Sequence, residues 1–114
     1  MGVKIGSIVQ RETQTASLAM HTGIYIGNGR VIHFDGESSG DGHSDRVVEC
    51  SIEEFADGKD VYVRREPKSL EHGRRVARRA REIMNDKSNK YNGNYGLIFG
   101  KNCQDFTEDC YNNA

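Results

Sequence analysis

The sequence predicts an α+β domain in which an antiparallel β-sheet packs against helices. Short apolar segments separated by turn-forming residues fill most of residues 5–64, whereas residues 69–84 have the apolar spacing of a helix. Two of the apolar segments flank Gly27-Asn28-Gly29, which is a strong hairpin signal. Strands that precede helices in a short chain are typical of α+β folds with antiparallel sheets.

Composition limits the size and the class of the protein. The chain has 114 residues, 35% of them hydrophobic and 29% charged, and its net charge is −1. This length suits one small core, so we predict a single domain over residues 1–114. The balanced charge argues against a nucleic-acid partner. No apolar run is long enough for a membrane span or a secretory signal, so we expect a cytoplasmic protein, or one of the host cytosol if the source is a virus or the protein an effector.

Five short strands are expected along the first half of the chain. They are predicted at residues 5–10, 21–27, 30–34, 47–50 and 61–64. Residues 35–45 consist of glycine and polar residues, most of which favour turns, and none of them is apolar. We expect a mobile surface loop there.

Helices are predicted where a capping residue precedes an apolar pattern. Ser51 and Glu54 form a capping box that opens a short helix ending near Gly58. Ser69 caps a longer helix. Its apolar face is expected to consist of Leu70, Gly73, Val76, Ala77, Ala80, Ile83 and Met84.

Arginines cover much of the rest of the long helix. They are Arg74, Arg75, Arg78, Arg79 and Arg81. Two interpretations stay open. The arginines form either a solvated face whose long stems cover apolar surface, or a peripheral contact with an anionic surface.

The last helix follows a loop rich in glycine and asparagine at residues 91–96. Asn102 is its expected N-cap, and Asp105 lies three residues later, where a carboxylate favours the helix dipole. Cys103 then occupies the first turn, where peptide dipoles and unpaired N–H groups favour a thiolate and can stabilise an oxyanion. Asn102 and Gln104 flank the thiol and are candidates for contacting the substrate there.

The cysteine count argues against a disulfide framework or a thiolate zinc site. Cys50, Cys103 and Cys110 are an odd number of thiols without a C-x-x-C pair. Cys103 and Cys110 are too far apart on one helix to be bridged. Cys110 shares a helical face with Phe106 and is expected in the core.

The hairpin determines whether two histidines share a face of the sheet. A two-residue turn makes the numbers of paired residues sum to 57, and it places His21 and His33 on opposite faces of the sheet. A three-residue loop with Gly29 in the left-handed conformation makes them sum to 56 and places both histidines on one face, together with Tyr25. The second register also gathers the apolar residues on the opposite face, so we predict it. Those residues are Ile24, Ile26, Ile32 and Phe34.

His21, His33 and Cys103 together suit nucleophilic catalysis. One imidazole takes the thiol proton, and the other orients the first imidazole by a hydrogen bond. Tyr25 is a candidate for positioning a substrate carbonyl. A zinc site made from the same three residues is the weaker alternative, so we predict no metal and no cofactor.

Two sequence blocks resemble the lecithin:retinol acyltransferase-like (LRAT-like) family. The run His21-Thr-Gly-Ile-Tyr-Ile-Gly-Asn-Gly-Arg-Val-Ile-His33 is similar to its first block, and Asn102-Cys-Gln-Asp-Phe106 to its second, which usually reads Asn-Cys-Glu-His-Phe. Thr22 stands where Trp is common. The order His, His, Cys is that of the circularly permuted papain-like fold of the NlpC-type superfamily, and the resemblance covers nearly the whole chain.

The resemblance implies one catalytic domain over residues 1–114. Cys103 is then the nucleophile, His21 the base and His33 the orienting residue, and an acyl group passes through a thioester to an amine, an alcohol or water. Family members act on phospholipid or other ester acyl groups, and relatives in the wider superfamily cleave peptide or isopeptide bonds. We therefore expect a small-molecule, lipid or peptide substrate and no transmembrane anchor. A thiol peptidase or amidase, and a non-catalytic module that binds anions through the arginine-rich helix, remain as alternatives.

Overall fold

A five-stranded antiparallel sheet and three helices make up the computed structural model, which describes residues 2–12, 20–35, 46–93 and 102–114. The strands are β1 (Ile8–Glu12), β2 (Met20–Gly27), β3 (Arg30–Asp35), β4 (Arg46–Ser51) and β5 (Tyr62–Arg65). The helices are α1 (Ile52–Ala56), α2 (Leu70–Asn85) and α3 (Cys103–Asn112). The strand order across the sheet is β4-β3-β2-β1-β5. The predicted fold class is confirmed. No helix in these described ranges is long and apolar enough to cross a membrane.

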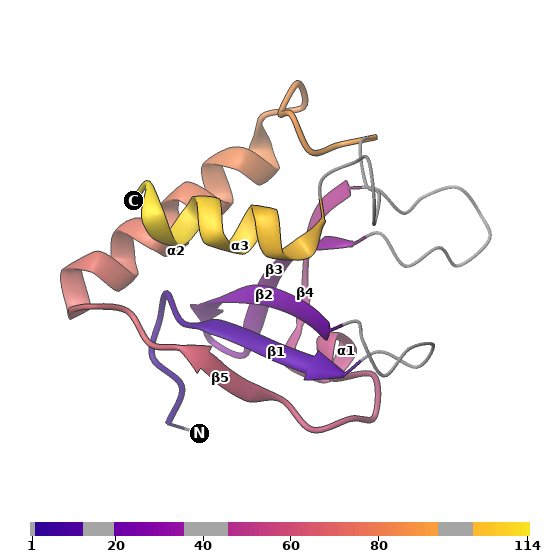
Figure 1. The fold of residues 1–114 in the computed structure, drawn as a ribbon, viewed down its shortest axis with the longest axis vertical. Coiled ribbons are helices and arrows are strands. Elements are labelled where there is room, and N and C mark those ends of the chain that lie inside the picture. The colour runs from indigo at the N-terminus through magenta and orange to yellow at the C-terminus, as the bar shows by residue number, and fades with distance from the viewer. Residues whose placement is uncertain (1, 13–19, 36–45, 94–101) are drawn as a thin grey trace.

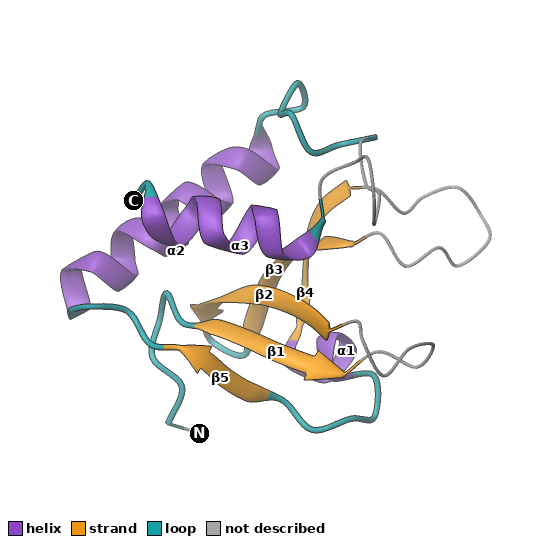
Figure 2. Ribbon diagram, viewed as in Figure 1, coloured by secondary structure: helices purple, strands orange, loops and turns teal. Residues whose placement is uncertain are grey.

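The two faces of the sheet carry different helices. Helices α2 and α3 lie together over one face, and α1 lies against the other (Figures 1 and 2). The larger apolar cluster joins the sheet to α2 and α3, and it includes all four strand residues predicted for that face. The smaller cluster includes Val9, Tyr25 and Val31 of the sheet with Ile52 and Phe55 of α1.

The hairpin between β2 and β3 has the predicted register but a different turn. Its paired residues are Ile24 with Ile32 and Tyr25 with Val31, and both pairs sum to 56. The three-residue loop is wrong, because Gly27 pairs with Arg30 and the register shifts just before this pair. Asn28 and Gly29 have φ angles of 54° and 71°, as a two-residue type I′ turn requires. A bulge next to Gly27 therefore supplies the one-residue offset that we had assigned to the loop.

The first strand begins three residues later than predicted. Residues 5–6 form a turn in which Gly6, with a φ of 90°, passes against Gly73 of α2, although Gly6 and Ser7 still exchange backbone hydrogen bonds with Tyr25. A Cβ on Gly6 would lie 2.3 Å from the Gly73 Cα, so no side chain fits between the two backbones. The other four strands match the prediction within one residue at each end.

The predicted helix caps are confirmed. Ser51 and Glu54 exchange capping-box hydrogen bonds of 3.0 Å, and the left-handed Asp57 ends α1. The Ser69 hydroxyl accepts a hydrogen bond from the His72 amide at 3.0 Å, which opens α2. Asn102 and Asp105 form a second capping box at the start of α3.

The apolar face of α2 is correct except at its first residue. Leu70 is 69% exposed, because it stands at the helix end beyond the packed layer. His72 is buried there instead. Its Nδ1 accepts a hydrogen bond from the Lys68 amide, so Nε2 carries the proton and donates to the Tyr111 carbonyl, with both distances 3.0 Å. A buried histidine with both nitrogens paired is a packing residue of this helix.

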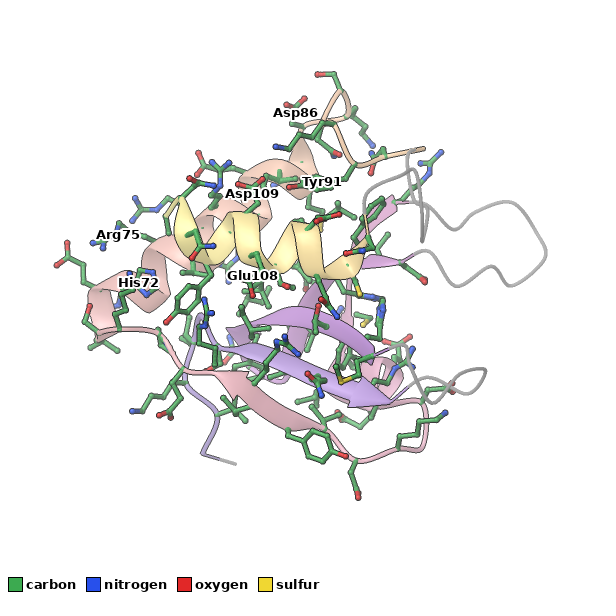
Figure 3. The ribbon with its side chains drawn as sticks, viewed as in Figure 1. His72, Arg75, Asp86, Tyr91, Glu108 and Asp109 are labelled. Atoms are coloured by element: carbon green, nitrogen blue, oxygen red, sulfur yellow. The ribbon has the colours of Figure 1, made fainter. Side chains whose placement is uncertain are left out.

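A carboxylate holds α2 and the segment after it against α3. Asp109 of α3 accepts hydrogen bonds from the Arg79 guanidinium, the Tyr91 hydroxyl and the Asn113 amide (Figure 3). Burial opposes ionisation of this group, but the three hydrogen bonds outweigh it and lower the pKa of Asp109 to about 2. This network fixes the helix whose first turn carries Cys103.

All three cysteines are free thiols. Cys110 and Phe106 are both fully buried, as predicted for a core pair. Cys50 is partly buried, and burial raises its pKa to about 11. The predicted loop at 35–45 lies outside the described residues except for Asp35, as do residues 94–96 of the loop predicted at 91–96.

Candidate active site

Two histidines meet on the sheet face that carries α1. His21 is the second residue of β2 and His33 lies on β3, and the Nε2 of His21 is 2.6 Å from the Nδ1 of His33. The two rings are nearly perpendicular, with centroids 4.8 Å apart. His21 is 1% exposed and His33 7% exposed. The predicted register thus produces a direct and buried imidazole–imidazole hydrogen bond.

Gly23 provides the space in which the two rings meet. A Cβ at this position would lie 2.6 Å from a methyl carbon of Val31 and 3.1 Å from the Cβ of His33. It would also lie 3.1 Å from the ring of Phe55. Any larger residue at position 23 must therefore displace the Val31 methyl group, and it would also crowd His33 and the Phe55 ring.

Phe55 and Arg11 enclose the histidine pair. The ring of Phe55 stacks on His21 with a centroid distance of 5.4 Å and meets the His33 ring edge-on at 5.5 Å. Arg11 lies opposite His21 in the β1–β2 register, and its Nε donates to the Phe55 carbonyl. A cation is therefore held permanently beside the two imidazoles.

Burial and this cation keep the histidine pair neutral. Burial, followed by the charges of His33 and Arg11, lowers the pKa of His21 to about 2. Burial and Arg11 lower the pKa of His33 to about 4. The two rings share one hydrogen-bonding proton, and both effects favour their neutral forms.

These lowered values predict that the protein loses stability in mild acid. An unfolded histidine takes up a proton as the pH falls through about 6.5, whereas folded His21 and His33 do not until the pH is much lower, so acid favours the unfolded chain. We expect the free energy of unfolding to fall by about 2–4 kcal/mol between about pH 7.5 and about pH 5. Urea unfolding at a series of pH values measures this slope.

The variant His33→Asn is the control for this prediction. It removes one of the two titrating groups and should reduce the slope by about half. An equal slope in the two proteins would contradict the assignment of the pH dependence to this pair.

Cys103 is the first residue of α3, as the predicted cap requires. The Asn102 side chain accepts from the Asp105 amide at 3.0 Å, and the Asp105 carboxylate accepts from the Asn102 amide at 2.9 Å. Cys103 is 4% exposed, and its thiol donates to the Met20 carbonyl oxygen over a sulfur–oxygen distance of 3.4 Å. The sulfur therefore lies against the peptide that joins Met20 to His21. Figure 1 shows that α3 starts at the end of the sheet where β2 begins.

The thiol and the histidine pair approach from different faces of the sheet. Buried Thr22 faces α3, where its hydroxyl lies 3.1 Å from the hydroxyl of Thr107. Successive strand residues point to opposite faces, so His21 points away from α3. Among the described residues, the hydrogen bond of the resting Cys103 thiol is to the Met20 carbonyl and not to an imidazole. The Cys103 thiol therefore contacts the backbone at the start of β2, at the peptide that precedes His21.

A family model described as Lecithin retinol acyltransferase matches residues 2–113. The chain belongs to this family. No curated protein gives a significant match. The predicted resemblance is thereby confirmed over nearly the whole chain, and the family is associated with acyltransferase or hydrolase chemistry that uses a cysteine.

The other candidate residues of this lecithin retinol acyltransferase family member have structural contacts. The Tyr25 hydroxyl accepts a hydrogen bond from the Gly29 amide at 3.1 Å and braces the hairpin turn. It lies four residues along β2 from His21, which corresponds to roughly 13 Å, so the structure does not bring Tyr25 to the thiol. Gln104 is partly buried, and its carbonyl accepts from the Thr107 hydroxyl at 3.2 Å.

The histidine pair is arranged for proton sharing. His21, His33 and Asp35 each place one potential metal-ligand atom within 4.8 Å of the others. However, two nitrogen ligands of a tetrahedral zinc ion would be about 3.3 Å apart, given zinc–nitrogen distances of about 2.0–2.1 Å. The observed 2.6 Å separation fits a single hydrogen bond.

Sequence reasoning missed three residues around the pair: Arg11, Asp35 and Phe55. Asp35 could have been found, because it follows His33 by two residues on the same strand and therefore shares its face. Arg11 fell outside the predicted first strand. Phe55 was assigned to the short helix, but nothing local indicated that this helix covers the histidine face.

Three arginines of the proposed anionic contact surface have intramolecular partners. Arg75 pairs with Glu71 at 3.1 Å, Arg79 with Asp109 at 2.8 Å, and Arg81 donates to the Ile26 carbonyl at 3.3 Å. Arg74 and Arg78 are exposed on the same helix. Part of the arginine stripe thus holds α2 to its neighbours, and a contact with an anionic surface stays a prediction.

Proposed function

We propose that this protein is a cysteine-dependent hydrolase or acyltransferase that works through a thioester acyl-enzyme. Cys103 is the nucleophile, His21 the base and His33 the residue that orients His21, within one catalytic domain. The observation that carries the proposal is the 2.6 Å hydrogen bond between the two buried histidines, with the Cys103 thiol against the peptide that precedes His21. Family membership supports the same chemistry.

The proposed role of His21 determines the tautomers of the two rings in this hydrogen bond. His21 uses Nε2 toward His33, which leaves Nδ1 as the nitrogen that exchanges a proton with the thiol. Nδ1 can accept a proton only if the neutral ring carries its hydrogen on Nε2, so His21 donates and the Nδ1 of His33 accepts. His33 then carries its own hydrogen on Nε2. This arrangement holds the His21 ring in one orientation, which is what a base requires.

Acylation follows from these positions. The thiol passes its proton to Nδ1 of His21, and the sulfur attacks the carbonyl carbon of the substrate. The Asp105 amide donates to the Asn102 cap, whereas the N–H groups of Cys103 and Gln104 precede the first helical hydrogen bond and are suited to stabilise the oxyanion that forms. His21 then returns the proton to the leaving alcohol or amine as the carbon–heteroatom bond breaks, and a thioester on Cys103 remains.

Deacylation uses the same base a second time. Water, an amine or an alcohol loses a proton to His21 and attacks the thioester carbonyl. The carbon–sulfur bond breaks and the Cys103 thiolate takes the proton back from His21. Water as acceptor makes the protein a hydrolase, and an amine or alcohol makes it an acyltransferase.

Trapping the acyl-enzyme tests this proposal. We expect a short-chain aryl ester or thioester to add one acyl group to wild-type protein, at Cys103, as measured by intact and peptide mass spectrometry. The adduct should be absent from His21→Ala. An adduct on Cys50, or none from any ester, thioester or peptide substrate, would contradict the proposal. Cleavage of peptides with no turnover of esters would instead identify a thiol peptidase with the same catalytic residues.

A further inference from the structure

A carboxylate lies beside the histidine pair. Asp35 ends β3, two residues beyond His33 on the same face, and it is partly buried. Extending the register that pairs Ile24 with Ile32 places Asp35 across from His21. One carboxylate oxygen of Asp35 and one nitrogen of each histidine all lie within 4.8 Å of one another.

The proposed reaction creates a positive charge on the histidine pair, where burial and the Arg11 guanidinium disfavour a cation. When His21 takes the thiol proton, the imidazole pair becomes cationic at a site almost closed to water and next to Arg11. Burying a charge without a compensating charge is strongly unfavourable. The thiolate balances it only at first, because the negative charge moves to the carbonyl oxygen once the carbon–sulfur bond forms.

We propose that Asp35 is a positioning residue that fixes the histidine pair and compensates its positive charge while His21 holds the thiol proton. This inference rests on the proposed function. The proton moves from sulfur to His21 and then to the leaving group, and no bond forms or breaks at the Asp35 carboxylate. At this short distance from the imidazoles, the negative charge of the carboxylate favours the protonated form of the ring.

Other charged and titratable groups face this carboxylate from the neighbouring elements. Arg46 of β4 is the residue paired with Asp35 in the β3–β4 register. The charges of Asp35, Arg11 and Glu54 of α1 all act on the pKa of the Cys50 thiol of β4. Arg11 opposes protonation of the histidines, and Asp35 is the carboxylate whose oxygen lies within 4.8 Å of both rings.

The test compares Asp35→Asn with Asp35→Glu. We expect Asp35→Asn to lower turnover of an aryl ester by about 10–100-fold with little change in KM. It should also move the midpoint of the pH profile of Cys103 alkylation upward by about 1–2 pH units. Asp35→Glu keeps the charge, so it should recover most of the turnover and most of the wild-type alkylation midpoint. Asp57→Asn is the matched control, because it removes an exposed carboxylate at a left-handed position that asparagine tolerates.

The activity and alkylation measurements have two outcomes that would overturn the role of Asp35. One is a wild-type alkylation profile in Asp35→Asn, and the other is an equal loss in the Asn and Glu variants, which would indicate packing alone. Loss of Zn²⁺ binding in Asp35→Asn with an unchanged alkylation profile would assign the cluster to a metal and also overturn it. If alkylation of Cys103 in the wild type does not depend on His21, the proposed function itself fails, and the two failures are thereby distinguished.

Discussion

Cys103→Ser is expected to lower turnover by at least about 10³-fold, because a nucleophile that acts with its base as a unit cannot be replaced in part. A serine hydroxyl is much less acidic than a thiol, so it gives up its proton to an imidazole far less readily. Steady-state hydrolysis of an aryl ester measures the loss.

Cys110→Ser is the matched control for that variant. Cys110 lies on the same helix, is fully buried, and has a pKa raised chiefly by burial, so it has no part in the proposed chemistry. We expect turnover within about threefold of the wild type, together with a loss of about 1–3 kcal/mol of stability from the buried hydroxyl. Turnover that survives in Cys103→Ser and is lost in Cys110→Ser would contradict the assignment of the nucleophile.

Gly73→Ala is expected to destabilise the fold by about 3 kcal/mol, although alanine is the better helix former by about 1 kcal/mol. The new Cβ would lie 2.1 Å from the backbone carbonyl oxygen of Ile5, and neither backbone can move without separating α2 from residues 5–7. Urea unfolding at neutral pH gives the difference.

Gly2→Ala is the control for this substitution. Nothing lies within 4 Å of a Cβ at Gly2, so its free energy of unfolding should change by less than about 0.5 kcal/mol. A Gly73→Ala protein as stable as the wild type would show that residues 5–7 and α2 are not packed backbone to backbone.

Local signals explain why so much of the fold could be predicted. The alternation of Ile24, Ile26, Ile32 and Phe34 set the strand register, because a slip of one residue would have turned this apolar set away from α2 and α3. The turn itself was misassigned, since a loop and a bulge produce the same one-residue offset. The caps of all three helices depend on contacts within four residues, and they could be predicted from the sequence for that reason.

Contacts between distant segments could not be predicted. The approach of Gly6 to Gly73, the exposure of Leu70 and the burial of His72 all depend on where α2 crosses the sheet. The hydrogen bond between Thr22 and Thr107 likewise joins residues 85 positions apart.

The candidate site also has a part that local signals predicted and a part that depends on contacts between distant segments. The neighbourhood of His21 and His33 followed from the hairpin register, whereas the position of Cys103 next to Met20 depends on how α3 packs. The catalytic roles of the three residues, and the circular permutation of the fold, remain predictions.

The rate at which iodoacetamide alkylates each cysteine, from about pH 4 to about pH 10, tests the central claim most directly. Wild type, His21→Ala and His72→Gln would be compared, with sites assigned by peptide mass spectrometry. Cys50 and Cys110 are internal references, because burial raises the pKa of both thiols. We predict that Cys103 reacts well below the pH of about 8.5 at which a free thiol ionises, and that only His21→Ala raises this pH. A free-thiol profile for Cys103, or one unchanged in His21→Ala, would contradict the account.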